Sequence, residues 1–529
     1  METAGEARTV ARPAHGLALV LALGVLTAPA AHAEKPLLPP DLDAPAVELA
    51  EAQQALSAQP GAGPVDAGRG ATAELRDLAL VLPQLEGRRR HAARALLARP
   101  PADDSGTEPF GGEWSNSAVE AAPVDTPHFR IHFVTNTEDA PDPEDTAPLN
   151  GIPDYVDLVA TRAEESYGIE NGLLGWPDAK PDGSRGGNDK VDVYLSDICG
   201  GGLCLFGYAN PDDTGAGCTN PPFKCFAYLV LDDDYSVGEF NYADPDIPLS
   251  VTIAHEYNHI LQFAIDAALE TWMFEATATW SEEQVFPDAD DWVLGTPGNP
   301  SFAARWAQDP EQPITKAGAT GGYRVYGSAV WNHWLTQGDS GFGADVVLDS
   351  WQRGRHARPR DFAIDAYHRG IRQNGGAGFG REFAHFTAAT SEWRTGDGGF
   401  PDAAELTDVD RQGRLAVGRG RRSVVLDHTA YRLLRVHRGS AASIRLRVKA
   451  PRRTRTGIAL VGRDGGPTGG TVTRRVTYLP NGGRGTVRLG GAQSFERITA
   501  VIANSDGRVD ANRRYLRDNR RFRARIARG

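Results

Sequence analysis

Two histidines and a glutamate lie close together in residues 246–263, which read DIPLSVTIAHEYNHILQF. His255 and His259 are four residues apart, so on an α-helix both imidazoles project from one face, about 40° apart, and can bind one zinc ion. Glu256 directly follows His255 and can accept a proton from water bound to that ion. The residue types and their spacing therefore predict hydrolysis by metal-activated water.

A catalytic zinc ion takes three protein ligands and keeps one position for water, so a third ligand must come from elsewhere in the chain. Gln262 and Ile265 stand where the metzincin pattern requires Gly and His, which excludes that pattern. The acidic candidates downstream are Asp266, Glu270, Glu275, Glu282 and Glu283. We choose Glu275, because WMFEATATW surrounds it with aromatic and small residues that suit a buried ligand on a second helix. Glu282 and Glu283 are expected to face solvent.

Hydrolysis of this kind also needs a neutral hydrogen-bond donor for the tetrahedral intermediate, and Tyr or His usually supplies it. The segment GGYRVYGSAVWNHW at residues 321–334 contains Tyr323, Tyr326 and His333. We select Tyr326 as the catalytic donor, because Gly327 beside it allows close approach of the backbone. The alternative is that these side chains belong only to an aromatic core helix. Thr279 is expected to hydrogen-bond to a metal ligand.

The elements that must position these residues follow from composition and periodicity. The chain has 529 residues, 40% hydrophobic and 24% charged, which excludes fibrous and wholly disordered classes. Apolar residues recur at helical spacing in residues 246–263, which predicts a buried helix. Residues 129–134, 189–197 and 227–231 have strand character. We therefore expect an α+β fold with a small mixed sheet ahead of the active-site helices; the alternative is a core helix with two structural histidines.

A family resemblance rests on two segments, HEYNHILQ and WMFEATATWSEE, which resemble the gluzincin arrangement of HExxH on one helix and a glutamate ligand on the next. The order of leader, strand, NGIPDYVD, HExxHxxQ, ExTATWxEE, a YG segment and a β-rich tail resembles a family of secreted bacterial proteins classed as metalloproteases, over residues 125–400. The resemblance implies a zincin-like peptidase domain with His255, His259 and Glu275 as zinc ligands and Glu256 as base. We expect an endopeptidase acting on peptides or proteins. The sequence contains no recognisable site for a terminal amine, the feature that would distinguish an exopeptidase from an endopeptidase.

The N-terminus predicts export. Arg8 and Arg12 precede an apolar run at residues 16–26 that is too short to span a membrane, and small residues up to Ala33 permit cleavage. We therefore expect a signal peptide at residues 1–33, a secreted protein and no transmembrane segment. Residues 34–118 are expected to be a partly disordered leader, either a propeptide or a flexible linker. The zinc metalloprotease domain is expected at residues 119–410.

All four cysteines lie in one Gly-rich region: Cys199, Cys204, Cys218 and Cys225. Outside the cytosol such a cluster predicts two disulfides. A zinc cluster is the alternative, but the spacing lacks CxxC pairs and no histidine lies within the region. The simplest connectivity joins each cysteine to its nearest neighbour in sequence.

A second candidate cofactor is calcium. Residues 150–154, NGIPD, resemble the end of secreted calcium loops, in which clustered oxygens bind a hard cation and a glycine makes the turn. The regular Asp-x-Asp spacing that should precede the asparagine is replaced by Pro148 and Leu149. The loop of residues 139–157 therefore matches a calcium loop only in part.

Charge divides the chain into two parts. Residues 411–529 carry 29 Lys and Arg against 6 Asp and Glu, whereas residues 1–410 carry 27 against 63. Short alternating runs between Gly-rich turns predict an antiparallel β-sandwich over residues 411–529. Its charge suits an anionic surface polymer, and no motif indicates a specific nucleic-acid partner. The alternatives are a solvated basic domain or, for the whole chain, a non-catalytic exported surface or polymer-binding protein with a structural HExxH helix.

Overall fold

The structure is a computed structural model that describes residues 44–56, 71–100 and 114–529, apart from residues 116, 200–203, 213–217, 219–220, 222, 296–299, 317–323, 355–361 and 511–513. The described residues all belong to one compact unit that begins at Pro36. The signal peptide expected at residues 1–33 lies outside the described residues. No described helix is both long enough and apolar enough to cross a bilayer. The fold is mixed α+β, as expected.

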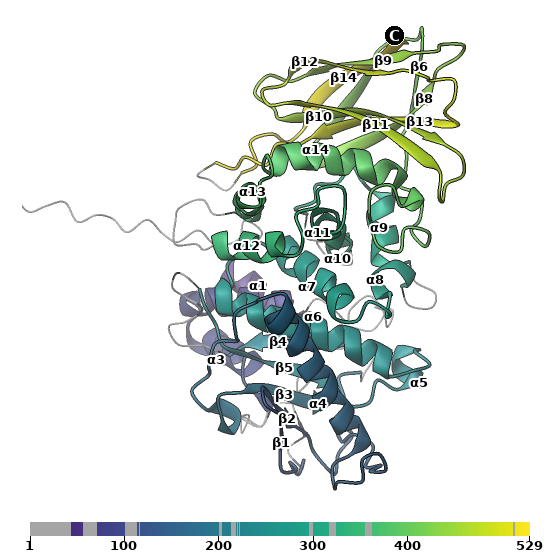
Figure 1. The fold of residues 1–529 in the computed structure, drawn as a ribbon. Coiled ribbons are helices and arrows are strands. Elements are labelled where there is room, and N and C mark those ends of the chain that lie inside the picture. Colours follow the sequence, from purple (N-terminus) through teal and green to yellow (C-terminus); the bar gives the residue numbers. More distant parts are fainter. Residues whose placement is uncertain are drawn as a thin grey trace, which may run out of the picture. The chain divides into compact units, whose positions relative to one another are not determined.

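The first sheet is mixed and has five strands in the order β1-β2-β3-β5-β4 (Figure 1). The strands are β1 (Val124–Asp125), β2 (Phe129–His132), β3 (Val191–Ser196), β4 (Gly207–Pro211) and β5 (Ala227–Asp232). Strands β2, β3 and β5 run parallel, and β4 pairs antiparallel with β5 at one edge. Every residue of β4 and β5 is buried, which agrees with the nearly continuous apolar sequence of β5, AYLVLD.

The body of the molecule, residues 119–410, also contains eleven described α-helices, of which α4 and α6 pack on the sheet. They are α4 (Asp154–Tyr167), α5 (Val237–Phe240), α6 (Asp246–Ile265), α7 (Thr271–Val285), α8 (Asp291–Leu294), α9 (Phe302–Gln308), α10 (Arg324–Gly327), α11 (Ala329–Thr336), α12 (Asp345–Arg353), α13 (Ala363–Gln373) and α14 (Phe379–Ala389). The predicted buried helix is confirmed as α6, which packs on β4, β5, α4 and α7. Because both α6 and α7 are enclosed on all sides, almost all their side chains are buried.

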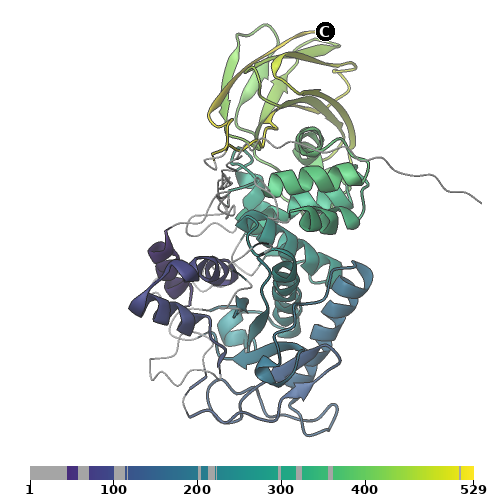
Figure 2. The ribbon, with the colours of Figure 1, turned by 90° about the vertical axis from the view of Figure 1, so that its left-hand side faces the viewer.

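Part of the expected leader is helical. It contains α1 (Pro45–Ala55), α2 (Ala71–Val81) and α3 (Gly87–Leu96), which are the purple and dark blue helices of Figure 2. Helix α2 packs against β4. Leu75, Leu78 and Leu82 are fully or almost fully buried and belong to the main hydrophobic core. These described segments of the leader are therefore integrated into the body rather than disordered.

The C-terminal region contains two further sheets, in the orders β11-β10-β13-β8-β6 and β12-β9-β14-β7. The strands are β6 (Arg414–Ala416), β7 (Arg422–Leu426), β8 (Ala430–His437), β9 (Ile444–Ala450), β10 (Thr456–Asp464), β11 (Thr471–Leu479), β12 (Gly483–Leu489), β13 (Arg497–Asn504) and β14 (Arg520–Arg528). Both sheets contribute to one apolar core, for example through Leu446 and Ile458. One pairing departs from the expected antiparallel pattern: β6 and β8 are parallel, because the intervening strand β7 lies in the other sheet.

The four cysteines form two disulfides, Cys199–Cys204 and Cys218–Cys225. The predicted local pairing is therefore confirmed. The first bridge precedes β4 and the second lies between β4 and the start of β5.

Candidate metal centre

Helices α6 and α7 bring His255, His259 and Glu275 together. The Nε2 atoms of the two histidines lie 3.3 Å and 3.6 Å from Oε2 of Glu275. One ligand atom from each residue lies within 4.8 Å of the others, close enough to bind a single ion. The three side chains predicted as ligands are thus gathered at one point, and each is at most 3% exposed.

The other nitrogen of His255 is held by Glu282. The distance from Nδ1 to Oε1 of Glu282 is 2.5 Å, so Nδ1–H donates to the carboxylate and Nε2 keeps its lone pair for an ion. The expectation that Glu282 and Glu283 face solvent is wrong, because they are only 1% and 8% exposed within the enclosed helix α7. Their charged types suggested a surface, whereas the seven-residue spacing from Glu275 to Glu282, two helical turns, could have identified the partner.

A chain of buried amides fixes the ring of His259. Its Nδ1 donates to Oε1 of Gln262 at 2.9 Å, and Gln262 donates to Asn258 at 2.6 Å, which in turn donates to Glu170 at 2.6 Å. The ring's Nε2 has no hydrogen-bond partner within the described structure. It lies 3.6 Å from Oε2 of Glu275, beyond hydrogen-bonding distance, and a metal ion between the two atoms would satisfy both. Sequence reasoning did not identify Gln262, Asn258 or Glu170.

The electrostatics of the cluster also favour a cation. Burial alone opposes a charged ring, but hydrogen bonds to Glu275 and Glu282 outweigh it and raise the pKa of His255 to about 10. Burial likewise opposes ionisation of Glu275, yet the two rings lower its pKa to about 2. The carboxylates thus hold a positive charge at neutral pH, and a divalent ion can replace the proton. The donor set fits zinc.

The predicted base, Glu256, lies on α6 between the two ligands and is 3% exposed. Its Oε2 accepts a hydrogen bond of 2.7 Å from the hydroxyl of Thr72, on helix α2. Thr72 was not among the candidates, since nothing in its local sequence links it to a residue 184 positions away.

The predicted donor Tyr326 lies beside the cluster. Its ring centroid is 5.7 Å from that of His255, and the side chain is 3% exposed. Gly327 does allow close approach, because a Cβ there would lie 2.4 Å from the carbonyl oxygen of Phe302. Tyr323 lies outside the described residues. His333 stacks on Trp292 in the helical core, where burial lowers its pKa to about 3.

The remaining third-ligand candidates serve other contacts. Asp266 accepts a hydrogen bond from the backbone of Ala268 after α6. Glu270 accepts one from the backbone of Ala363 and another from the hydroxyl of Tyr515. The hydroxyl of Thr279 has no hydrogen-bond partner among the described residues, so its expected bond to a metal ligand is not formed.

In the predicted calcium loop, two aspartate side chains accept hydrogen bonds from backbone amides of the same loop. Asp145 accepts hydrogen bonds from the amides of Asn150 and Gly151, and Asp154 accepts them from Thr146 and Ala147. Whether it binds calcium stays a prediction.

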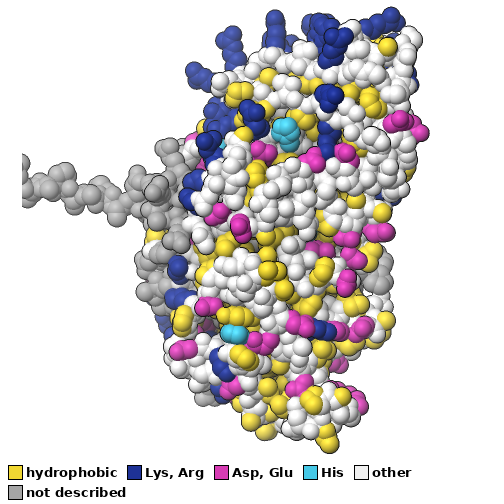
Figure 3. All heavy atoms as spheres, in the orientation of Figure 1, with side chains coloured by type: hydrophobic (Ala, Val, Ile, Leu, Met, Phe, Trp, Pro, Cys, Tyr) yellow, Lys and Arg dark blue, Asp and Glu magenta, His cyan; other side chains and the backbone are white. Residues whose placement is uncertain are grey.

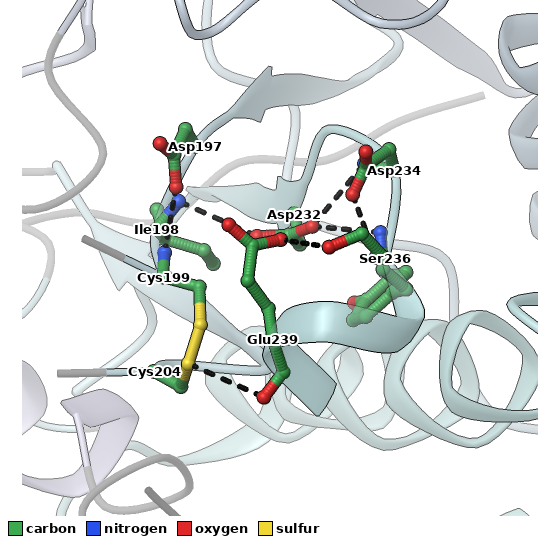
Figure 4. Close-up of a disulfide and its surroundings, with 9 residues drawn as sticks. Asp197, Ile198, Cys199, Cys204, Asp232, Asp234, Ser236 and Glu239 are labelled. Carbon is green, nitrogen blue, oxygen red and sulfur yellow. Dashed lines mark hydrogen bonds between the residues drawn. A yellow bond between two sulfur atoms is a disulfide. The ribbon is translucent and has the colours of Figure 1, made fainter. Parts of the chain in front are cut away.

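A different acidic group lies beside the Cys199–Cys204 disulfide (Figure 4). It comprises two overlapping sets that could each hold an ion: Asp197, Asp232 and Asp233, and Asp232, Asp234 and Glu239. Burial raises the pKa of Asp232 to about 8 and that of Asp233 to about 9. Sequence reasoning did not single out this group.

A comparison with protein-family models finds no match, and a comparison with curated proteins finds none either. The functional assignment therefore depends on the residues and geometry described above.

Proposed function

We propose that the protein is a secreted zinc-dependent peptidase of gluzincin type, with a zincin-like domain and a C-terminal β-sandwich. The observation that supports this proposal is the convergence of His255 Nε2, His259 Nε2 and Glu275 Oε2 at one buried point. Both Nδ1 atoms are already hydrogen-bonded, which directs the opposite nitrogens toward the same ion. The resemblance to secreted metalloproteases points to the same activity.

In the proposed mechanism, zinc at this point would act as a Lewis acid: it would lower the pKa of a water molecule to about 7 and polarise the peptide carbonyl. Glu256 accepts the proton of the attacking water and later returns it to the leaving amine. Tyr326 donates a hydrogen bond to the oxyanion that develops on the substrate. Glu282 and Gln262 keep the two imidazoles in the ligating tautomer.

The decisive experiment compares the secreted protein with its Glu256→Gln variant. Metal analysis should find zinc in both, and hydrolysis of a peptide library should disappear in the variant and in wild type treated with a chelator. The loss expected on removing a general base is about 10²-fold to 10⁴-fold. Hydrolysis that persists in Glu256→Gln, or purified wild type that contains no zinc, would rule the peptidase out.

A second function, binding of an anionic surface polymer, is favoured by the outer face of β12, β9 and β14. Lys449 lies directly opposite Arg484 on one side and Arg523 on the other, and Arg447 lies opposite Arg525. Basic side chains gather over the C-terminal sheets (Figure 3). Like charges placed opposite each other destabilise a sheet, so this arrangement suggests a role outside folding.

Heparin, as a sulfated polysaccharide probe, tests this second function. Lys449→Glu should lower the salt concentration that elutes the protein more than Arg475→Glu does, because Arg475 is an exposed residue of β11 in the other sheet. Equal shifts would mean that net charge, and not this face, governs binding. A protein that binds the polymer but shows no turnover would be the non-catalytic alternative.

A further inference from the structure

The first turn of α2 occupies the space between strand β4 and the proposed base. The hydroxyl of Thr72 donates to Oε2 of Glu256 at 2.7 Å and accepts from the amide of Ala209 at 2.9 Å. Among the described strands β4 pairs only with β5, so this amide is on the free side of an edge strand. Thr72 is only 3% exposed, so solvent has little access to its contacts with the Glu256 carboxylate and the Ala209 amide.

A free edge strand beside the proposed base could bind a peptide substrate. An extended peptide can add to such an edge through main-chain hydrogen bonds, which would place a peptide bond next to the hydrolytic group. Thr72 takes up one of these main-chain donors and the proton-accepting oxygen at once. With Glu256 3% exposed, neither water nor a peptide reaches it while α2 is in place.

Arg76, one turn further along α2, fastens the helix to the connection between α6 and α7. It donates to the carbonyl of Leu269 at 2.8 Å and to the hydroxyl of Thr271 at 2.7 Å. Its guanidinium lies 4.7 Å from the ring centroid of Phe274, which directly precedes the ligand Glu275. The leader thus contacts both helices that carry the metal ligands.

Arg99 fastens the other end of the same segment. The three nitrogens of its guanidinium each donate to a different buried carboxylate, those of Asp182, Asp192 and Asp212. The contacts to Asp182 and Asp212 are 2.6 Å long. Asp212 comes three residues after Ala209, or about 10 Å along an extended chain. These charge-assisted bonds are of the strong kind. Thr72 and Arg99 thus hold the segment at two points, one at the middle of β4 and one just after its end.

We propose that residues 71–99 hold the peptidase at low activity by occupying the place where its substrate would bind. Thr72 covers the base and the edge strand, while Arg76 and Arg99 fix the segment to the body. Release of the segment opens the site. This inference rests on the proposed peptidase function, since an occupied cleft regulates activity only if the site hydrolyses peptides.

The test uses the zinc-loaded full chain and a pool of quenched fluorescent peptides. Arg99→Glu places a negative charge against three carboxylates and should expel the segment, so hydrolysis should rise at least about tenfold, within the usual range of coupling between sites. Hydrogen exchange of the α2 amides should become faster in the same variant. Arg89→Glu is the matched control: it makes the same charge change at an exposed position of α3 and should leave both readouts unchanged.

Thr72→Val provides a second variant that keeps the shape of the side chain and removes only the hydroxyl. It should raise hydrolysis at least about fivefold, as expected when both hydrogen bonds of the hydroxyl are lost. If α2 exchanges faster but both variants hydrolyse peptides no faster than an active wild type, the inference is overturned and the peptidase stands. If α2 is released, zinc is bound and no form hydrolyses peptides, the peptidase proposal fails and the inference fails with it.

Discussion

Two buried polar clusters lie at β4, and they differ in the source of their positive charge. The candidate metal centre combines two imidazoles with Glu275, and its positive charge is a proton that a metal ion could replace. The Arg99 cluster, formed by Arg99, Asp182, Asp192 and Asp212, receives its charge from a side chain of the leader. The first cluster can therefore exchange its cation with solution, whereas the second loses its cation only when a segment of chain moves.

The two clusters also differ in how far apart their residues lie in the sequence. The ligands of the metal centre come from two consecutive helices within 21 residues of sequence. The Arg99 cluster joins residues from the leader, a loop, β3 and the end of β4. The candidate metal ligands thus come from one short stretch of sequence, whereas the proposed block on the site depends on contacts between distant parts of the chain.

The largest effect is expected when the exchangeable cation loses a ligand. Glu275→Gln should lose zinc on dialysis and reduce hydrolysis by about 10³-fold or more, beyond the range expected for an outer-shell contact. Glu283→Gln on the same helix is the matched control, because burial raises the pKa of Glu283 to about 9 and glutamine mimics its protonated form. Zinc retained by Glu275→Gln at the wild-type level would remove this residue from the ligand set.

A smaller effect is expected when the outer partner of His255 changes. Glu282→Gln replaces a carboxylate that holds Nδ1–H, so zinc affinity should fall about 10-fold to 100-fold, as measured by competition with a chelator. The same variant should lower the pKa of the metal-free His255 ring. An unchanged affinity would mean that Glu282 does not orient the ligand.

In the Arg99 cluster, the shape of the cation is expected to matter as well as its charge. Arg99→Lys keeps the charge but cannot direct separate N–H groups to three carboxylates. We expect stability to fall by about 1–3 kcal/mol, the range for buried acceptors left without a donor. Chemical denaturation should reveal this loss, and Arg89→Lys should leave the midpoint unchanged. Equal midpoints for both variants would mean that charge alone holds the cluster.

The smallest effect concerns pH. Burial raises the pKa of Asp182 to about 6, although Arg99 opposes the shift. Because this folded-state pKa exceeds the unfolded value, the stabilising contribution of the protonated group is lost as pH rises from about 4 to about 6. Asparagine does not titrate, so Asp182→Asn does not lose stability in this way as the pH rises. The free energy of unfolding of the variant minus that of wild type should therefore increase from pH 4 to pH 7, by less than about 1 kcal/mol after solvent screening. A parallel pH dependence for both proteins would contradict the raised pKa.

Local patterns allowed the clustering of His255, His259 and Glu275 to be predicted. The spacing of His255 and His259 defines one helical face, and the apolar surroundings of Glu275 correctly indicated a buried helix. Glu282 was missed because residue type suggested a surface, although α7 is enclosed on all sides. Thr72 and Arg99 could not be found at all, because their partners are far away in sequence and only the folded chain brings them together.

For the fold, alternation predicted the strands more reliably than their pairing. The strand-rich C-terminal region begins close to the expected boundary, at Arg414. The parallel pairing of β6 with β8 depends on β7 crossing to the other sheet, which no local pattern indicates. The described helices of the leader fold because α2 packs against β4 and α3 packs against α1 and α2; whether the leader is partly disordered stays a prediction.

The two disulfides have a consequence for the opened form of the molecule. Cys199–Cys204 precedes β4, and Cys218–Cys225 follows it. The backbone at Cys225 also donates to the carbonyl of Phe263 near the end of α6. Each bridge closes a short loop on one side of β4, and the strand itself is held by its pairing with β5, in which the leader takes no part. If residues 71–99 leave as proposed, the edge of β4 should therefore keep its place and remain available for pairing.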